Sequence, residues 1–175
     1  MHFKSQRNGW KDPAKRNYES IRMEMASGLR SYAIEKASDY DESTLLILGD
    51  RNNDIGAASV EVMTGELELK DFSANSSCRV TKSLKPSCNG VSPREPKLIP
   101  LFEYRRENSS KRIKKPRGSH KYKGKEHQLD EIYILPKDLP RVVRKTKQVA
   151  IGFEGQFYKG SDHKMLWVEL LPMAN

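Results

Sequence analysis

The sequence predicts an α/β fold, with a mixed or antiparallel sheet, flanking helices and a long basic loop. A helical spacing of apolar residues between 13 and 37 precedes a predicted strand at 44–48, of which residues 45–48 form an unbroken apolar run. Two further runs, 129–135 and 165–171, have the length and apolar content of strands. A chain of 175 residues favours one domain, so we expect residues 1–175 to form a single unit.

The first helix is predicted to run from Pro13 to Ala37, because Asp12 can cap a helix and proline suits its first position. Apolar residues then recur at steps of three and four, which predicts one face that packs on the sheet. The residues of this face are Tyr18, Ile21, Met25, Leu29 and Tyr32.

Shorter elements are expected elsewhere. A second helix is predicted at 57–63, and short strands are predicted at 98–104 and 148–153. The segment between them contains Cys78 and Cys88 in loop-like surroundings. The pair could form a disulfide, but we favour two free thiols in a reducing compartment.

The predicted strand 44–48 leads into a polar corner. We expect this strand to be buried on both faces, because it is apolar without alternation. Gly49 follows it, and Asp50 and Asn52 come next, at the rim where open α/β sheets place their sites. A turn without a function would explain the same residues, since Asp and Asn favour turns.

Two further corners contain residues of the same kinds. Asp130 lies in the predicted strand 129–135, and Asp162 and His163 precede the last strand. Strands of one sheet can bring such corners together. Carboxylate, amide and imidazole groups without cysteine suit a hard cation such as Mg²⁺ or Mn²⁺. An imidazole with a carboxylate to orient it can activate water.

The formal net charge of +9 is concentrated in one segment. Residues 105–125 contain ten Lys or Arg and one acidic residue, so charges in the rest of the chain balance. A basic loop of this kind attracts polyanions such as DNA or RNA. A solvated loop with no partner is the alternative. The residues expected to contact nucleic acid are Arg105, Arg106, Lys111, Arg112, Lys114, Lys115, Arg117, Lys121 and Lys123.

The sequence also bears on location. No apolar stretch approaches the length of a membrane span, so none is expected. The residues after Met1 lack the apolar segment of a signal peptide, which favours a cytoplasmic location. Secretion stays open if an N-terminal segment is missing.

Four short blocks follow one another along the chain: His2-Phe3-Lys4-Ser5, Gly49-Asp50-Arg51-Asn52, Leu129-Asp130-Glu131-Ile132 and Ser161-Asp162-His163. In this order they resemble the endonuclease/exonuclease/phosphatase superfamily, the metal-dependent phosphoesterases related to DNase I. The family's blocks are His-Leu-Lys-Ser, Gly-Asp-Phe-Asn, Ile-Asp-Tyr-Ile and Ser-Asp-His, so Arg51 replaces a phenylalanine. The resemblance implies a DNase I-like sandwich and hydrolysis of phosphodiesters.

The resemblance also implies roles for the matching residues. The implied catalytic residues are His2, Asp50, Asn52, Asp130 and His163, and the implied metal ligands are Asp50 and Asp162. Asp50 would orient or deprotonate the attacking water, and Asn52 would hold the phosphate or Asp50. His163 would contact the phosphate or act as base, with Asp130 fixing its tautomer. His2 would lie near the leaving group, and Mg²⁺ or Mn²⁺ would act as a Lewis acid.

The match covers only the C-terminal half of the family's domain. The family's metal-binding Glu belongs to the other half and has no counterpart here. A half-sandwich would leave an apolar sheet face incompletely covered in this chain alone, to be covered by the missing half or by self-association. The residues of that face are Leu46, Leu48, Ile132, Ile134, Leu166 and Val168.

We therefore expect a divalent-metal-dependent nuclease. Two alternatives stay open: a catalytically impaired remnant that binds nucleic acid through the basic loop, and a phosphatase of small phosphorylated substrates. His120 and His127, in and beside the basic loop, are expected to be solvated side chains without a role.

Overall fold

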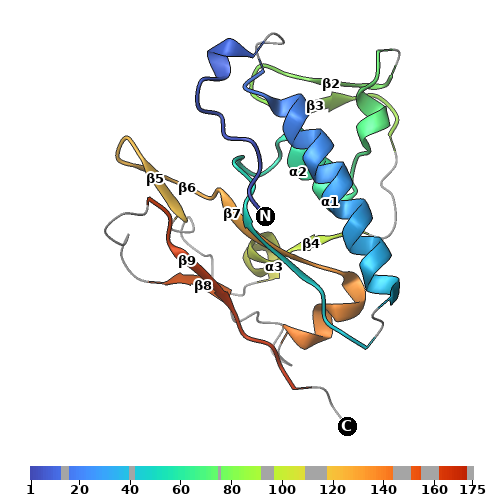
Figure 1. Cartoon of the computed structure of the whole chain (residues 1–175), viewed down its shortest axis with the longest axis vertical. Coiled ribbons are helices and arrows are strands. Elements are labelled where there is room, and N and C mark those ends of the chain that lie inside the picture. The colour runs from blue at the N-terminus through green and yellow to red at the C-terminus, as the bar shows by residue number, and fades with distance from the viewer. Residues whose placement is uncertain are drawn as a thin grey trace.

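The structure is a computed structural model, and it describes residues 1–12, 16–39, 42–74, 76–91, 97–108, 118–143, 151–154 and 162–172. Helices and small antiparallel sheets alternate along the chain, which confirms the predicted α/β class (Figure 1). Within these residues, no helix is both long and apolar enough to cross a membrane.

The largest sheet has three strands, with β7 (Asp130–Ile134) between β1 (Leu46–Asp50) and β4 (Ile99–Pro100). Both neighbours run antiparallel to β7. In the β1–β7 register, Asp50 lies opposite Asp130. The two predicted acidic corners therefore meet at one end of this sheet.

The other described strands form two-stranded hairpins. They pair β2 (Cys78–Val80) with β3 (Pro86–Cys88), β5 (His120–Tyr122) with β6 (Lys125–His127), and β8 (Ile151–Glu154) with β9 (Met165–Val168). The helices are α1 (Glu19–Asp39), α2 (Ala58–Thr64) and α3 (Leu101–Asn108), with 3₁₀ turns at Gly9–Lys11, Leu69–Phe72 and Pro136–Arg141.

Strand β7 separates two apolar cores. Successive side chains of a strand point to opposite faces. Tyr133 accordingly joins a core with residues of α1 and α2, while Ile132 and Ile134 join a core with residues of α3, β8 and β9. In Figure 1, α1 and α2 pack together on one side of the sheet, and the β8–β9 hairpin lies away from them. Every residue of β7 is buried as a result.

Helix α1 begins later than predicted, at Glu19. The carboxylate of Asp12 accepts hydrogen bonds from the backbone N–H groups of Arg16 and Tyr18, both at 2.9 Å. Asn17 and Tyr18 have positive φ, which helical residues do not adopt. Asp12 thus stabilises a turn before the helix, and residues 13–15 lie outside the described part of the chain.

The buried face of α1 also differs from the predicted one. It contains Met23, Ala26 and Ala33, together with the charged pair Glu19 and Arg22, and it lies roughly a quarter-turn from the predicted stripe. The stripe itself is largely exposed: Ile21, Met25 and Tyr32 all face solvent. The prediction was wrong because it excluded charged residues from the core, where Glu19 and Arg22 are buried as a pair.

Three strand predictions need correction. Strand β1 lies at the sheet edge, so Ile47 is buried but Leu48 is 48% exposed, and burial on both faces was wrong. The expected strand at 98–104 is a two-residue strand that leads directly into α3. The expected start of the next strand, 148–150, lies outside the described residues, and β8 begins at Ile151.

The predicted exposed sheet face is mostly covered. Ile132 and Ile134 are fully buried, because residues of α3 and β8 pack over them. Leu46, Leu166 and Val168 are half-buried against the same core. Leu48 is exposed, so four of the six predicted residues are not fully buried and the face is incompletely covered, as predicted, although it is not bare.

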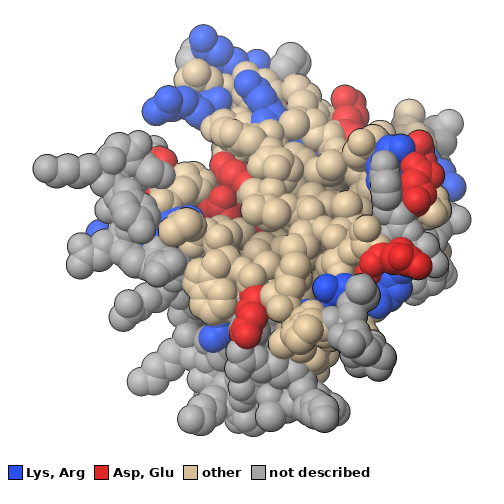
Figure 2. Space-filling view, turned by 60° about the horizontal axis from the view of Figure 1, so that its bottom comes forward, with Lys and Arg blue, Asp and Glu red and all other residues tan. Residues whose placement is uncertain are grey.

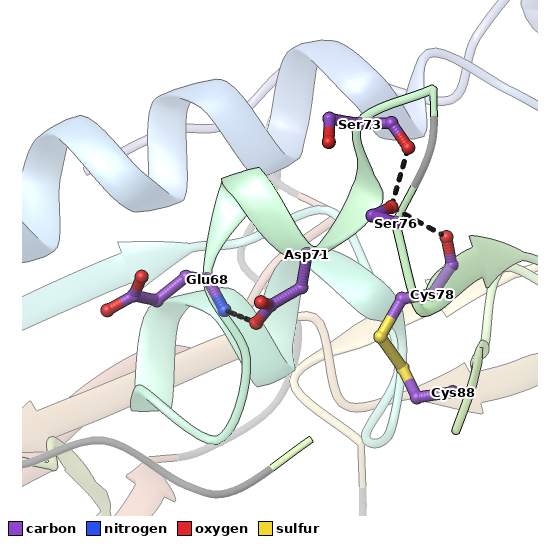
Figure 3. Close-up of a disulfide and its surroundings, with 6 residues drawn as sticks. All are labelled: Glu68, Asp71, Ser73, Ser76, Cys78 and Cys88. Atoms are coloured by element: carbon purple, nitrogen blue, oxygen red, sulfur yellow. Dashed lines mark hydrogen bonds between the residues drawn. A yellow bond between two sulfur atoms is a disulfide. The ribbon is translucent and has the colours of Figure 1, made fainter. Parts of the chain in front are cut away.

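Cys78 and Cys88 form a disulfide, so the prediction of two free thiols was wrong (Figure 3). The two residues lie directly opposite each other in the β2–β3 pair, with 4.1 Å between their Cα atoms. The ten-residue spacing could not indicate this register. Ser76, next to the hairpin, donates from its hydroxyl group to the carbonyl groups of Ser73 and Cys78.

Candidate functional site

The candidate site lies at the end of the sheet where β1 and β7 present Asp50 and Asp130. The N-terminal segment also reaches this point, because the backbone N–H of Phe3 donates to the carbonyl of Asp50 at 2.9 Å. Gly49 permits this approach: its φ is +136°, and a Cβ there would lie 2.1 Å from the carbonyl oxygen of Met1. His2 is thereby placed beside Asp50, with 3.5 Å between His2 Nε2 and Asp50 Oδ2.

Asn52 holds the Asp50 carboxylate in a fixed direction. Its backbone N–H donates to Oδ1 at 2.7 Å, and its Nδ2 donates to Oδ2 at 2.8 Å. The same amide donates to the carbonyl of Phe3 at 2.9 Å. Asn52 adopts φ +51°, a conformation that asparagine tolerates better than most residues. The predicted association of Asn52 with Asp50 is therefore present.

Asp130 and His163 form a close carboxylate–imidazole pair in the site. His163 Nδ1 lies 2.7 Å from Asp130 Oδ2. Because a carboxylate accepts hydrogen bonds, this contact puts the proton of a neutral imidazole on Nδ1 and the lone pair on Nε2. His163 Nε2 faces two further carboxylates, Asp50 Oδ2 at 3.8 Å and Asp162 Oδ1 at 3.9 Å. Three acidic corners thus converge on one imidazole.

The two outermost predicted residues are exposed. The side chain of His2 is 73% accessible and that of Asp162 is 71% accessible. Asp162 reaches back toward the protein, where its Oδ2 lies 3.1 Å from His120 Nε2. Both side chains are placed at the mouth of the site, where a ligand could reach them.

His120 belongs to this cluster, contrary to the sequence prediction. Its side chain is only 13% exposed, and its ring centroid lies 4.7 Å from that of His163. The sequence signal at this point is the turn Lys123-Gly124, where both residues have positive φ, but it indicates only the hairpin and not the pairing with His163. Such a turn joins a tight hairpin and sets His120 opposite His127. His127 is more exposed, and its Nδ1 lies 3.8 Å from Asp54 Oδ2.

A buried ion pair lies directly behind the two acidic corners. Arg51 follows Asp50 and Glu131 follows Asp130, and Arg51 Nη1 lies 3.5 Å from Glu131 Oε2. Neither side chain is more than 1% exposed. Arg51 also donates to the hydroxyl of Tyr133 at 3.3 Å. This pair ties the ends of β1 and β7 together from within.

Burial disfavours the charged form of Glu131, whereas hydrogen bonds and Arg51 favour it. Its Oε1 accepts from the backbone N–H groups of Phe102 and Ile132, at 3.1 and 3.0 Å. Burial nevertheless raises the pKa of Glu131 to about 7, with Arg51 and these hydrogen bonds acting in the opposite direction. The same burial raises the pKa of Tyr133 to about 12.

A second buried cluster holds the loop after Asn52. Glu19 Oε2 accepts from Asn53 Nδ2 at 2.6 Å and from Arg22 Nε at 2.9 Å. Glu19 Oε1 accepts from the backbone N–H of Ser59 at 2.7 Å, at the start of α2. The charged residues that replace the expected apolar face of α1 therefore connect that helix to the corner at Asp50.

The carboxylates of the site differ in how they ionise. Burial raises the pKa of Asp50 above its ordinary value, and the nearby Asp130 adds to the shift, while the N–H of Asn52 and the ring of His163 oppose it. At Asp162 desolvation is the largest single cause and raises the pKa, but hydrogen bonds and the nearby rings of His120 and His163 together outweigh it, so the pKa is lowered. Asp162 is thus the more readily charged of the two.

Part of the predicted basic loop lies in the described elements. Arg105 and Arg106 lie on α3, and Arg105 Nη1 donates to the carbonyl of Ile151. Lys121 and Lys123 are exposed on the β5–β6 hairpin. The face drawn in Figure 2 shows described basic side chains in separate groups, with acidic ones between them. The predicted residues that lie outside the described part of the chain are Lys111, Arg112, Lys114, Lys115 and Arg117.

Among the described residues, one group of His, Cys, Asp and Glu side chains could hold a metal ion. It consists of His120, Asp162 and His163, whose ligand atoms all lie within 4.8 Å of one another. Asp50 lies next to this group through its contact with His163.

No protein-family model, no curated protein and no solved structure matches this chain.

Proposed function

We propose that the chain is a divalent-metal-dependent phosphodiesterase that hydrolyses nucleic acid, and that its sheet is part of a DNase I-like sandwich. The observation that carries the proposal is the 2.7 Å contact between His163 Nδ1 and Asp130 Oδ2. It fixes the imidazole with its lone pair directed toward Asp50 and Asp162. This is the arrangement a general base needs: a defined tautomer and access to a water molecule.

The chain's own residues supply each part of the reaction. His163 Nε2 accepts the proton of the attacking water, and Asp130 stabilises the imidazolium that forms. Asp50, held by both hydrogen bonds from Asn52, orients that water. His2 is exposed and lies beside Asp50 Oδ2, where it can contact the leaving group.

The carboxylates of Asp50 and Asp162 are the groups that would hold Mg²⁺ or Mn²⁺. Both reach within 4 Å of His163 Nε2, so their oxygens converge on one region. Oxygen ligands of this kind suit these ions. When bound, such an ion polarises a phosphoryl oxygen as a Lewis acid.

Nucleic acid is the substrate that the charges favour. Lys121 and Lys123 are exposed on the hairpin that also holds His120 next to Asp162. Cations at the edge of a phosphodiesterase site can bind the flanking phosphates of a polymer.

The test is metal-dependent cleavage of plasmid DNA and of RNA, with Mg²⁺, Mn²⁺ or EDTA. Wild type and the matched control His127→Ala should cut, and EDTA should stop the reaction. His163→Ala should lower the rate by about 10²–10⁴-fold, because the base is lost. Asp130→Asn should also lower it, because the amide favours the wrong imidazole tautomer.

Other outcomes would identify a different function. Equal rates for wild type and His163→Ala would remove the proposed site. Salt-dependent binding of nucleic acid without cleavage would favour a non-catalytic binder. Hydrolysis of a small phosphomonoester, with nucleic acid left intact, would favour a phosphatase.

A further inference from the structure

We infer that His120, Asp162 and His163 form a binding site for one transition-metal ion, for which Zn²⁺ is the best match. His120 Nε2 lies 3.1 Å from Asp162 Oδ2, and Asp162 Oδ1 lies 3.9 Å from His163 Nε2. Zinc bonds of about 2.0–2.1 Å place tetrahedral ligands roughly 3.3 Å apart. Small side-chain rotations are therefore enough to bring the three ligand atoms around one ion.

The backbone holds these ligands at a fixed spacing. His120 and His163 form an antiparallel β-bridge. Next to it, the N–H of Lys164 donates to the carbonyl of Ser119 at 2.7 Å, and that of Lys121 donates to the carbonyl of Asp162 at 3.3 Å. The β5–β6 hairpin and the segment before β9 are thus joined at the site, and the ligands lie on paired strands.

His163 already has the second partner that metal-binding histidines use. Its Nδ1 contacts Asp130 Oδ2, so Nε2 presents its lone pair toward Asp162. A carboxylate behind the imidazole fixes the ring and raises its basicity toward a metal. The bound ion takes the place of the hydrogen bond between His120 Nε2 and Asp162 Oδ2, and a neutral His120 keeps its one ring proton on Nδ1.

The ligand set selects the class of metal. Two imidazoles and one carboxylate suit Zn²⁺ and its neighbours, whereas Mg²⁺ prefers oxygen ligands. Three protein ligands leave a fourth position for water or for a phosphate oxygen. Since the Asp162 side chain is 71% exposed, an ion can reach the site from solvent.

The site overlaps the proposed catalytic one at His163 and at Asp162. An ion on Nε2 occupies the lone pair that would accept a proton from water, so Zn²⁺ should inhibit hydrolysis. This consequence rests on the proposed function, whereas the metal site itself does not.

The test is titration calorimetry of the full chain with ZnSO₄, with Co²⁺ absorption as a second readout. Wild type and His127→Ala, a histidine of the same hairpin, should bind one Zn²⁺ each. Asp130→Asn, which changes only the partner behind His163, should weaken Zn²⁺ binding by roughly 10–100-fold. His120→Ala removes a ligand and should weaken Zn²⁺ binding by more than that. Asp162→Ala serves as a second ligand variant, because its exposed side chain is not needed for folding.

Wild-type affinity in both His120→Ala and Asp162→Ala, or no Zn²⁺ binding by wild type, would overturn the inference. Equal loss of affinity in His127→Ala would do so too. The two proposals fail separately: Zn²⁺ binding without any nuclease activity removes only the proposed function, and Mg²⁺-dependent cleavage without Zn²⁺ binding removes only the metal site.

Discussion

Glu131 links the charge state of the buried ion pair to the stability of the fold. Its folded-state pKa of about 7 lies above the ordinary value of 4.5, because burial disfavours the charged carboxylate. Between these values the folded protein binds more protons than the unfolded chain. The free energy of unfolding should therefore fall as pH rises through this window, with the contribution fully present below 4.5.

We predict that this contribution falls by up to about 3 kcal/mol between pH 4.5 and 7, and that Glu131→Gln removes it. Urea denaturation at several pH values measures it, with Glu24→Gln on the exposed face of α1 as the control. Asp50 also has a raised pKa. Burial also raises the pKa values of Glu61 and Glu103. A pH dependence that survives Glu131→Gln would therefore assign the effect to Asp50 or to these two glutamates.

At the scale of elements, the N-terminal segment and β1 meet through one glycine. Gly49→Ala adds a Cβ that collides with the backbone of Met1 and also disfavours the φ of +136°. We predict that residues 1–3 detach from Asp50, with a loss of about 1–3 kcal/mol in the free energy of unfolding. In proton NMR, adding Asp50→Asn should shift the ring signals of His2 in the wild-type background but not in the Gly49→Ala background. Gly28→Ala, where an added Cβ meets open space, is the control.

The elements that could be predicted are those that a short stretch of sequence determines by itself. Strand β7, helix α2 and the polar corner at Asp50 follow from an apolar run and the turn residues after it. The buried face of α1 could not be predicted, because Glu19 is stable inside only with Arg22, Asn53 and Ser59 around it. These partners come from three segments, so their meeting depends on tertiary structure.

The same distinction applies to the site. Asp50, Asn52, Asp130 and His163 could be selected because their blocks resemble a known family, and the structure brings them together. His120 has no such block around it, and only its strand pairing places it beside His163. The disulfide depends likewise on the register of β2 and β3, which the sequence spacing of its cysteines does not determine.

At the scale of the whole molecule, one face of the β1–β7 pair is covered by other elements over β7 but open to solvent over β1. Leu48 and Ile132 lie opposite each other in the β1–β7 register, yet Leu48 is 48% exposed and Ile132 is 1% exposed. We predict that Ile132→Ala lowers the free energy of unfolding by about 2–5 kcal/mol, and Leu48→Ala by less than about 1 kcal/mol. Equal losses in chemical denaturation would mean that Leu48 is covered too, by a second copy or another chain.

The Arg51–Glu131 pair has a consequence for how this protein can change over generations. Loss of Glu131 alone leaves the charge of Arg51 buried and uncompensated, and loss of Arg51 alone removes the cation that opposes the raised pKa of Glu131. Breaking a buried pair in this way costs about 3–5 kcal/mol, a large part of a typical domain's stability. Replacing both with apolar residues of similar size is often neutral. Descendants of this chain should therefore keep both residues or exchange both. Positions 51 and 131 should therefore co-vary, although they lie far apart in the sequence.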